Sequence, residues 1–261
     1  MIATLHIQVV NKNNLSVLVK SYCTTPYKII NITEDKSNPT LQLMLMSSSP
    51  GILSGDVYNQ LIEVAEQAAL QMHTQAYQRL FTMQLQATQT ANIHVANGAT
   101  FIYLPHPTVP HAGASYVSAN NFYLQQNSTL IFGEVLTCGR KLNNEAFLFN
   151  KYHSITQIFM QNKLVIKENL LVQPGVLDVN IMGQLEGYTH QASMLCIHPT
   201  IVVPQLISTL VTALHTQQGI EFGVSATPIN GVMIRLLGNG AEQLFTCLQQ
   251  LLNLVQQQMK H

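Results

Sequence analysis

Two carboxylates lie in sequence surroundings where a negative charge is costly. Glu134 interrupts the apolar run at residues 130–136, and Asp56 closes a Gly-Asp pair shortly after a Ser-Pro-Gly segment. A carboxylate in a buried strand must be paired, hydrogen-bonded or placed beside a water-filled path. Arg140 and Glu145 follow closely. Two interpretations stay open: a structural ion pair between Glu134 and Arg140, or a polar passage for a hard or borderline cation, lined by carboxylates.

The ten histidines give no metal-site pattern of their own. The closest pair, His106 and His111, lies in a stretch with three prolines, which predicts a stiff extended loop. A structural zinc site needs four ligands, usually cysteine and histidine at short spacing, and this spacing is absent from the sequence. Transient metal contact at His106, His111 or His261 stays open. Cys138 and Cys196 are expected to pack as small apolar groups, with soft metal contact as the alternative.

Motifs of common enzymes are missing from the sequence. Gly-x-Ser-x-Gly, the P-loop pattern and the dinucleotide-binding Gly-x-Gly-x-x-Gly are all absent. A β-rich hydrolase using Glu134 or Glu145 remains an alternative, although no second carboxylate nearby has an obvious acid or base role. A β-helical structural or carbohydrate-binding module ranks last, because the chain has no tryptophan and only 7% aromatic residues.

The composition indicates a packed protein that works inside a complex. Of 261 residues, 47% are hydrophobic and only 9% are charged, with 12 basic and 12 acidic side chains. A neutral surface lacks the repulsion that keeps proteins apart, and it lacks the basic stripe that nucleic acid requires. No apolar stretch is long enough for a membrane span, and no signal peptide pattern is visible. With four dispersed cysteines and no disulfide framework expected, the cytoplasm is the predicted location.

The first 200 residues read as strands. Strict apolar/polar alternation at 81–88 predicts the clearest strand, and 69–74 looks similar. Three hairpins are expected, at 93–104 around Asn97-Gly98, at 121–132 and at 155–166. Turns recur roughly every 30 residues, a period long enough for a layered β-array. The prediction is therefore a mainly β fold with an elongated body of stacked hairpins, like a β-helix, over residues 1–200.

The last quarter predicts a small α+β unit, residues 201–261, packed on the body as part of one continuous domain. Pro204 can open a helix whose apolar face runs to Leu214. A strand pair follows at 221–225 and 232–237, and a second helix carries an apolar stripe over 244–259. We expect both stripes to be core, with docking on a partner as the alternative.

Short motifs in a fixed order resemble the UreD/UreH family of urease accessory proteins. They cover residues 47–190, more than half of the chain, and they are specific as a set rather than singly. The motifs are Ser49-Pro50-Gly51, Gly55-Asp56, Thr74-Gln75-Ala76, Asn97-Gly98-Ala99, Leu104-Pro105, Val109-Pro110, Gly133-Glu134-Val135-Leu136, Gly139-Arg140, Glu145, Phe147 and Gly187-Tyr188-Thr189-His190. The chain departs from the family pattern at His111, at 78–80 and at 172–174, but not in the Gly-Asp or Gly-Arg elements.

The resemblance implies a non-catalytic scaffold with an elongated β-fold and two C-terminal helices. It implies binding to apo-urease and to UreF and the GTPase UreG, with nickel in transit through an internal polar tunnel and no tightly bound cofactor. Asp56 and Glu134 are the candidates for this nickel path, because carboxylates hold Ni²⁺ less tightly than imidazole or thiolate. Arg140, Glu145, Tyr188 and His190 are expected at interface or structural positions.

Overall fold

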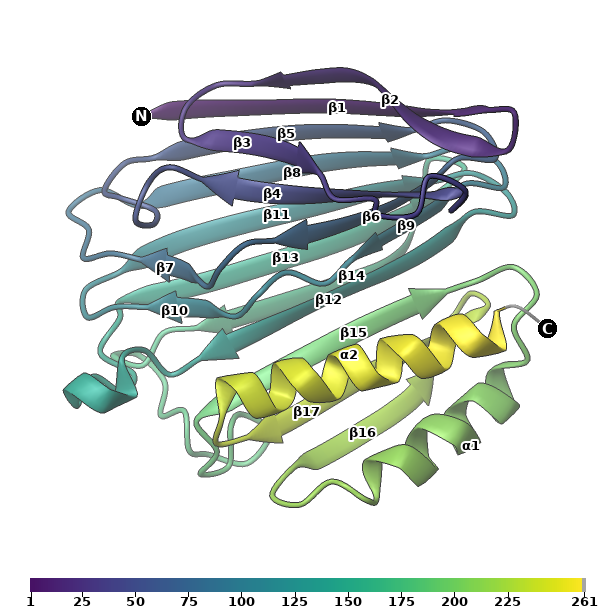
Figure 1. Ribbon diagram of the computed structural model, residues 1–261. Coiled ribbons are helices and arrows are strands. Elements are labelled where there is room, and N and C mark those ends of the chain that lie inside the picture. The colour runs from purple at the N-terminus through teal and green to yellow at the C-terminus, as the bar shows by residue number, and fades with distance from the viewer. Residues whose placement is uncertain (260–261) are drawn as a thin grey trace.

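The computed structural model describes residues 1–259, and His261, a predicted metal contact, lies outside this range. The described chain is mainly β, with two α-helices near its end (Figure 1). The elements are β1 (Ile2–Lys12), β2 (Leu15–Cys23), β3 (Tyr27–Asn31), β4 (Thr40–Ser47), β5 (Val57–Val64), β6 (Ala69–Thr74), β7 (Gln78–Leu80), β8 (Ala87–Val95), β9 (Thr100–Tyr103), β10 (Thr108–Pro110), β11 (Ser115–Leu124), β12 (Thr129–Thr137), the 3₁₀ turn η1 (Lys141–Asn143), β13 (Lys151–Met160), β14 (Lys163–Val172), β15 (His190–Ile197), α1 (Val203–Leu214), β16 (Glu221–Ala226), β17 (Gly231–Gly238) and α2 (Ala241–Gln258).

The strands form two stacked sheets. Sheet A has the order β14-β13-β11-β8-β5-β1-β2, and its inner strands are parallel. Sheet B has the order β16-β17-β15-β12-β9-β6-β4-β3, with β7 and β10 attached beside β12. From β4 to β13 the chain passes alternately from one sheet to the other, so successive turns stack as in a β-helix. Tyr116 of β11 pairs with Ala87 one turn earlier and with Tyr152 one turn later, which bears out the predicted period of about 30 residues.

Two of the three expected hairpins are wrong. Residues 93–104 and 121–132 each join a strand of sheet A to a strand of sheet B, so their turns are corners between sheets. The corner at Gly98 still needs a turn residue, because its backbone has φ = 66°. The turn chemistry is therefore the same as in a hairpin, but the strands pair with neighbouring turns instead of with each other. The third expectation is confirmed, since β13 and β14 form an antiparallel pair.

The segment predicted as the clearest strand is largely a loop. Residues 81–86 cross the end of the sandwich between β7 and β8, and β8 begins only at Ala87. Ser54 fixes this crossing, because its hydroxyl accepts hydrogen bonds from the N–H groups of Gln84 and Leu85. Leu85 is 69% exposed, so the alternation here does not bury one face. By contrast, the strand expected at 69–74 is confirmed as β6.

Apolar residues fill both ends of the space between the sheets. At one end a cluster around Leu5, Phe101 and Phe122 packs the sheets together, with the rings of Phe122 and Phe132 centred 5.0 Å apart. At the other end a second cluster surrounds Leu80 and Tyr116. Between these two apolar clusters, the middle of the sandwich can hold polar side chains.

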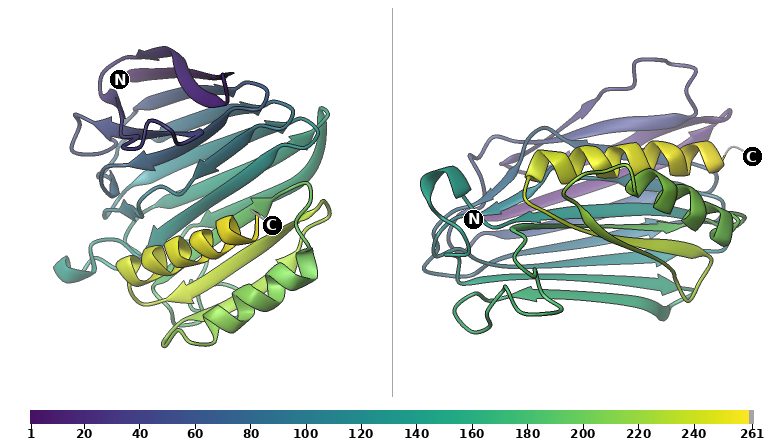
Figure 2. Two further views of the ribbon diagram at one scale, coloured as in Figure 1. Left: turned by 45° about the vertical axis from the view of Figure 1, so that its right-hand side comes forward. Right: turned by 90° about the horizontal axis from the view of Figure 1, so that it is seen from below.

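The C-terminal segment extends sheet B and covers its outer face. β17 pairs with β15 and with β16, and α1 and α2 pack against these strands on the side away from sheet A (Figure 2). Pro204 lies in the first turn of α1, and Leu206, Leu210 and Leu214 are fully buried. The expected helices, the strand pair and the core role of the apolar stripes are confirmed. None of the helices within residues 1–259 is both long and apolar enough to span a membrane.

Candidate functional site

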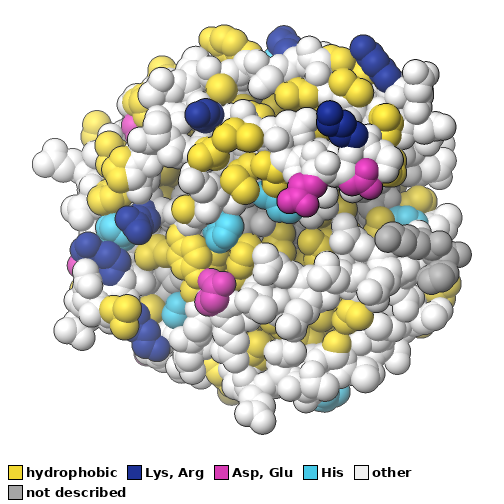
Figure 3. Space-filling model, viewed as in Figure 1, with side chains coloured by type: hydrophobic (Ala, Val, Ile, Leu, Met, Phe, Trp, Pro, Cys, Tyr) yellow, Lys and Arg dark blue, Asp and Glu magenta, His cyan; other side chains and the backbone are white. Residues whose placement is uncertain are grey.

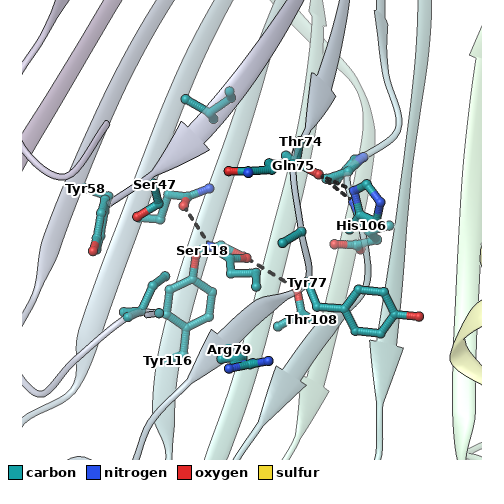
Figure 4. Close-up of a pocket in the computed structure, with 18 of the residues that line it drawn as sticks. Ser47, Tyr58, Thr74, Gln75, Tyr77, Arg79, His106, Thr108, Tyr116 and Ser118 are labelled. Carbon is teal, nitrogen blue, oxygen red and sulfur yellow. Dashed lines mark hydrogen bonds between the residues drawn. The ribbon is translucent and has the colours of Figure 1, made fainter. Parts of the chain in front are cut away.

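A cavity of 330 Å³, lined by both polar and apolar side chains, lies between the two sheets, between the apolar clusters. Its wall includes inward side chains of sheet A, such as Gln60 and Ser118, and Glu134 from sheet B. Figure 4 shows side chains of both layers converging on this space, among them Tyr58, Tyr116 and Ser118. One polar link joins the layers, because Thr108 Oγ1 donates to Gln78 Oε1 (3.3 Å) and Gln78 Nε2 donates to Gln89 Oε1 (3.4 Å).

The polar part of the cavity wall arises because polar residues occur at matching positions of successive turns. Gln89 of β8 pairs with Tyr58 of β5 on one side and with Ser118 of β11 on the other. Ser118 pairs in turn with Ser154 of β13. Since side chains alternate between the two faces of a strand, these residues share the inner face with the apolar core. They form a transverse polar row, which we call the inner row of sheet A.

Glu134 is the acidic group of this cavity. Its carboxylate Oε2 accepts a hydrogen bond from the hydroxyl of Ser154 across the sandwich, at 2.8 Å. Burial raises the pKa of Glu134, the Ser154 hydrogen bond lowers it, and the charge of Glu168 raises it further. The alternative of an ion pair between Glu134 and Arg140 is wrong, because Arg140 is bound to Glu145 instead. Glu134 therefore lines the cavity and takes no part in an ion pair with Arg140.

Tyr77 and five further tyrosines line the same cavity. Burial raises the pKa values of Tyr27, Tyr58, Tyr103, Tyr116 and Tyr152, so all five phenols remain protonated at neutral pH. The hydroxyl of Tyr27 accepts a hydrogen bond from Gln60 at 2.6 Å. The buried hydroxyl of Tyr116 has no hydrogen-bond partner among the residues that the structure describes. The wall thus offers uncharged hydroxyl groups that can form hydrogen bonds with a hydrated ion or a polar molecule in the cavity.

The cavity reaches the surface beside β7, through the segments 75–79 and 105–106. His106 lies at this opening, where Thr74 Oγ1 accepts its backbone N–H at 2.8 Å and lies 2.9 Å from its Nδ1 (Figure 4). Its ring stacks on Phe245 of α2 with a centroid separation of 4.7 Å. Burial lowers the pKa of His106, which favours the neutral imidazole. Hydrophobic and histidine side chains gather on this part of the surface, while charged groups are scattered (Figure 3).

The remaining candidate histidine and cysteines do not line the cavity. His111 is buried, with its ring 4.7 Å from that of Phe81. Burial raises the pKa values of Cys138 and Cys196, so these thiols stay protonated, as expected for small apolar groups. Among the described residues, no three His, Cys, Asp or Glu side chains are placed to hold a metal ion together.

Asp56 lies at the end of the sandwich, outside the cavity lining. Its carboxylate accepts hydrogen bonds from the N–H of Leu53 (2.9 Å), the amino group of Met1 (3.0 Å) and the hydroxyl of Tyr58 (3.3 Å). With these partners the buried carboxylate is satisfied by the protein itself. Because Tyr58 also lines the cavity, Asp56 orients one residue of its wall.

The other predicted residues lie at the same end of the sandwich: Arg140, Glu145 and Tyr188 in loops, and His190 at the start of β15. Arg140 and Glu145 flank η1 and form a bidentate ion pair, whose hydrogen bonds lower the pKa of Glu145. Tyr188 donates its backbone N–H to Leu185. His190 is buried, its Nδ1 lies 2.7 Å from the Thr189 hydroxyl, and burial lowers its pKa to about 4. The structure therefore gives these four residues structural contacts and places none of them in the cavity wall.

Sequence reasoning missed most of the cavity wall. Glu134 was recognised because a charge interrupts an apolar run. The wall residues Gln60, Gln89 and Ser118, and Ser154, which bonds to Glu134, are neutral and look ordinary within their strands. The signal was present in the period: these residues follow one another at 29, 29 and 36 residues, close to one turn of the fold. A search for polar residues at inward positions spaced by one turn would have found them.

Comparison with known proteins gives a consistent result along the whole chain. The family model described as UreD urease accessory protein matches residues 1–261. The chain is 43% identical to the urease accessory protein UreD of Flavobacterium johnsoniae over 92% of its own length and 87% of the relative. It is 32% identical to the UreD protein of Acetivibrio thermocellus, over 96% of both chains. The chain belongs to the UreD urease accessory protein family.

Proposed function

We propose that this protein is a non-catalytic urease maturation factor, which works in the cytoplasm, links apo-urease to UreF and the GTPase UreG, and lets nickel pass through its internal cavity. The observation that carries the proposal is the polar cavity with Glu134 in its wall, in a chain of the UreD family. Burying polar side chains between the two apolar clusters lowers the stability of the fold. A transit path for a cation would explain this cost.

The chemistry of the wall suits transfer better than storage. Its inner part offers carboxylate, phenol, hydroxyl and amide oxygens, and no cysteine lines it within the described chain. Oxygen donors suit hard cations, while Ni²⁺ binds more tightly to imidazole or thiolate. A Ni²⁺ ion with its waters would therefore be held loosely near Glu134 and released again. His106 at the opening supplies one imidazole that could receive the ion first.

The structure does not place Glu134 and Glu145 together, which weakens the hydrolase alternative. A hydrolase using Glu134 or Glu145 would need a second acid or base group beside that carboxylate, and the other glutamate is the nearest candidate in the sequence. Glu145 is engaged with Arg140 in the η1 loop, and it is not part of the cavity wall around Glu134. The geometry therefore favours passage over hydrolysis.

The test is co-expression of the protein with UreF and UreG, followed by size-exclusion chromatography and urease activation with nickel. Glu134→Gln should leave the shared elution peak intact and reduce nickel-dependent activation. Glu221→Gln is the matched control, because Glu221 is an exposed carboxylate of β16. Full activation by the Glu134→Gln protein, or the lack of a shared peak in the wild type, would contradict the proposal.

A further inference from the structure

The wall of the cavity is mostly uncharged. Within the described chain only two Lys, Arg, Asp or Glu side chains line it: Arg79, which is exposed at the opening, and Glu134 in the interior. Its other polar groups are amides and hydroxyls, and its phenols are protonated. A charged guest gives up much favourable hydration in such a space, whereas a neutral polar guest gives up less. The wall therefore has the chemistry of a site for an uncharged molecule.

The hydroxyl of Tyr116 is an unused hydrogen-bonding group in this wall. Tyr116 of β11 is 1% exposed, and its hydroxyl has no hydrogen-bond partner among the described residues. The Gln78 amide lies close enough to lower the pKa of the phenol, but it makes no well-aligned hydrogen bond with it. Tyr116 and Ser118 reach into the same space from one face of β11 (Figure 4). Because a buried hydroxyl without a partner is uncommon and costly, this donor indicates a place for a polar guest.

The amides beside this hydroxyl are joined by long hydrogen bonds. Thr108 Oγ1 and Gln78 Oε1 are 3.3 Å apart, and Gln78 Nε2 and Gln89 Oε1 are 3.4 Å apart. Both distances exceed the usual ranges, about 2.5–3.0 Å for O–H···O and about 2.7–3.2 Å for N–H···O. Bonds of this length are weak, so a guest can replace them at little cost. Gln89 uses only its oxygen in this link, which leaves its NH₂ group for the guest.

A small planar amide matches these groups in type and in size. The wall offers donors in the Tyr116 hydroxyl and the Gln89 NH₂ group, and it offers an acceptor in the Gln78 oxygen. An amide has a carbonyl oxygen that accepts and N–H groups that donate, so it satisfies both kinds of group at once. A metal ion, by contrast, gives the Tyr116 hydroxyl nothing to donate to. The volume of 330 Å³ is at the lower end of the range for small-molecule sites, about 300–1,000 Å³.

We infer that the cavity binds a small neutral amide, of the class of urea and acetamide, between Gln78, Gln89 and Tyr116. The Tyr116 hydroxyl donates to the carbonyl of the guest, and the N–H groups of the guest donate to the Gln78 oxygen. The polar wall extends past this point, since Asn120 pairs in register with Thr156, whose buried hydroxyl also has no partner among the described residues. Binding of the amide does not depend on nickel. That an occupied cavity would hold back a passing ion is a consequence that rests on the proposed function.

The experiment follows the methyl signal of acetamide by saturation-transfer NMR on the full-length chain, without nickel and without partner proteins. A ligand this small binds at best in the range of tens of micromolar, so a titration from about 0.1 to 50 mM covers the expected affinity. Tyr116→Phe should raise the dissociation constant about three- to tenfold, because it removes one hydrogen bond to the guest. Its melting temperature should not fall, since the lost hydroxyl has no partner. Tyr22→Phe is the matched control, at a tyrosine of β2 that is 54% exposed, and should leave the affinity unchanged.

Acetamidinium is the matched probe. It has the shape of acetamide but carries a positive charge and no carbonyl oxygen, so it cannot accept from Tyr116. Its binding should therefore be no weaker in Tyr116→Phe than in the wild type.

The outcomes separate the amide site from the nickel passage. Equal acetamide affinity in Tyr116→Phe and the wild type, or no saturation transfer across the titration, would overturn the inference. An equal loss in Tyr22→Phe would place the binding elsewhere and overturn it as well. None of these results decides the proposed function, which is judged by urease activation with Glu134→Gln.

Discussion

Replacing Glu134 by glutamine should make the protein more stable and less able to activate urease. Glutamine has the same shape and keeps an oxygen that can accept the Ser154 hydroxyl, now 2.8 Å from the carboxylate. It removes the negative charge that burial disfavours. A residue whose removal stabilises the fold but impairs activity is retained for function rather than for packing.

The sign of the effect follows from the raised pKa of Glu134. Because the folded protein binds this proton more tightly than the unfolded chain, the wild type loses stability as pH rises between the unfolded and the folded pKa values. Each pKa unit corresponds to about 1.4 kcal/mol. For a chain of this size, 1 kcal/mol shifts the melting temperature by about 2–4 °C. Glu134→Gln should therefore melt higher than the wild type at pH 7.5, and the difference should vanish below the unfolded pKa, at about pH 4.

The assay is thermal unfolding of both proteins across pH 4–8, combined with nickel-dependent urease activation. Ser154→Ala is the informative contrast, because it leaves the charge and removes its hydrogen bond. That variant should lose about 1–3 kcal/mol, the cost of an unsatisfied buried group. A Glu134→Gln protein that melts lower than wild type at pH 7.5 would refute the reasoning, since the carboxylate would then be stabilised by the fold.

Three further changes test the packing and the pH dependence of the fold. Gly133→Ala should cost about 1–3 kcal/mol in urea unfolding, because its Cβ would lie 2.6 Å from Leu104 Cδ1 and 3.0 Å from the Ser193 carbonyl oxygen; a neutral effect would mean that β12 and β15 can separate. Leu248→Ala should cost about 2–5 kcal/mol, because Leu248 of α2 is fully buried against sheet B; an effect below 1 kcal/mol would place α2 outside the core. With a pKa lowered to about 4, His190 favours its neutral form in the folded state, so wild-type stability should fall as pH drops from about 6.5 toward 4, by up to about 3 kcal/mol. His190→Gln should flatten that part of the urea-unfolding profile, and an unchanged profile would exclude His190 as its source.

The sequence predicted the class of the fold and the details of its last quarter, because those signals are local. The proline at 204 and the apolar stripes are sufficient to place α1 and α2, whose partners are determined by burial alone. Pairing between strands is different. Asn97-Gly98 marks a turn in any fold, but whether the next strand pairs with the previous one or with the next turn depends on contacts about 30 residues away. Those contacts leave no trace in a window of ten residues.

The candidate site was predicted unevenly for a related reason. Glu134 could be found because a charge inside an apolar run is costly in any context. The same reasoning predicted the wrong partner for Glu134. Arg140 is near in sequence but is bound to Glu145, whereas Ser154 donates a hydrogen bond to Glu134 from the opposite sheet.

A stacked fold of this kind gives a simple way to build a passage. Each turn contributes one side chain to each transverse row. One polar residue per turn at the same inward position therefore produces a continuous polar row, as in the line from Gln89 through Ser118 to Ser154. The apolar rows on either side hold the sheets together, so the path need not stabilise the fold. Its residues can then be selected for weak, successive contacts with a cation. The buried carboxylate of Glu134 and the unpartnered hydroxyl of Thr156 lower the free energy of unfolding. That loss of stability would be the measurable sign that the polar row is retained for the path and the apolar rows for the packing.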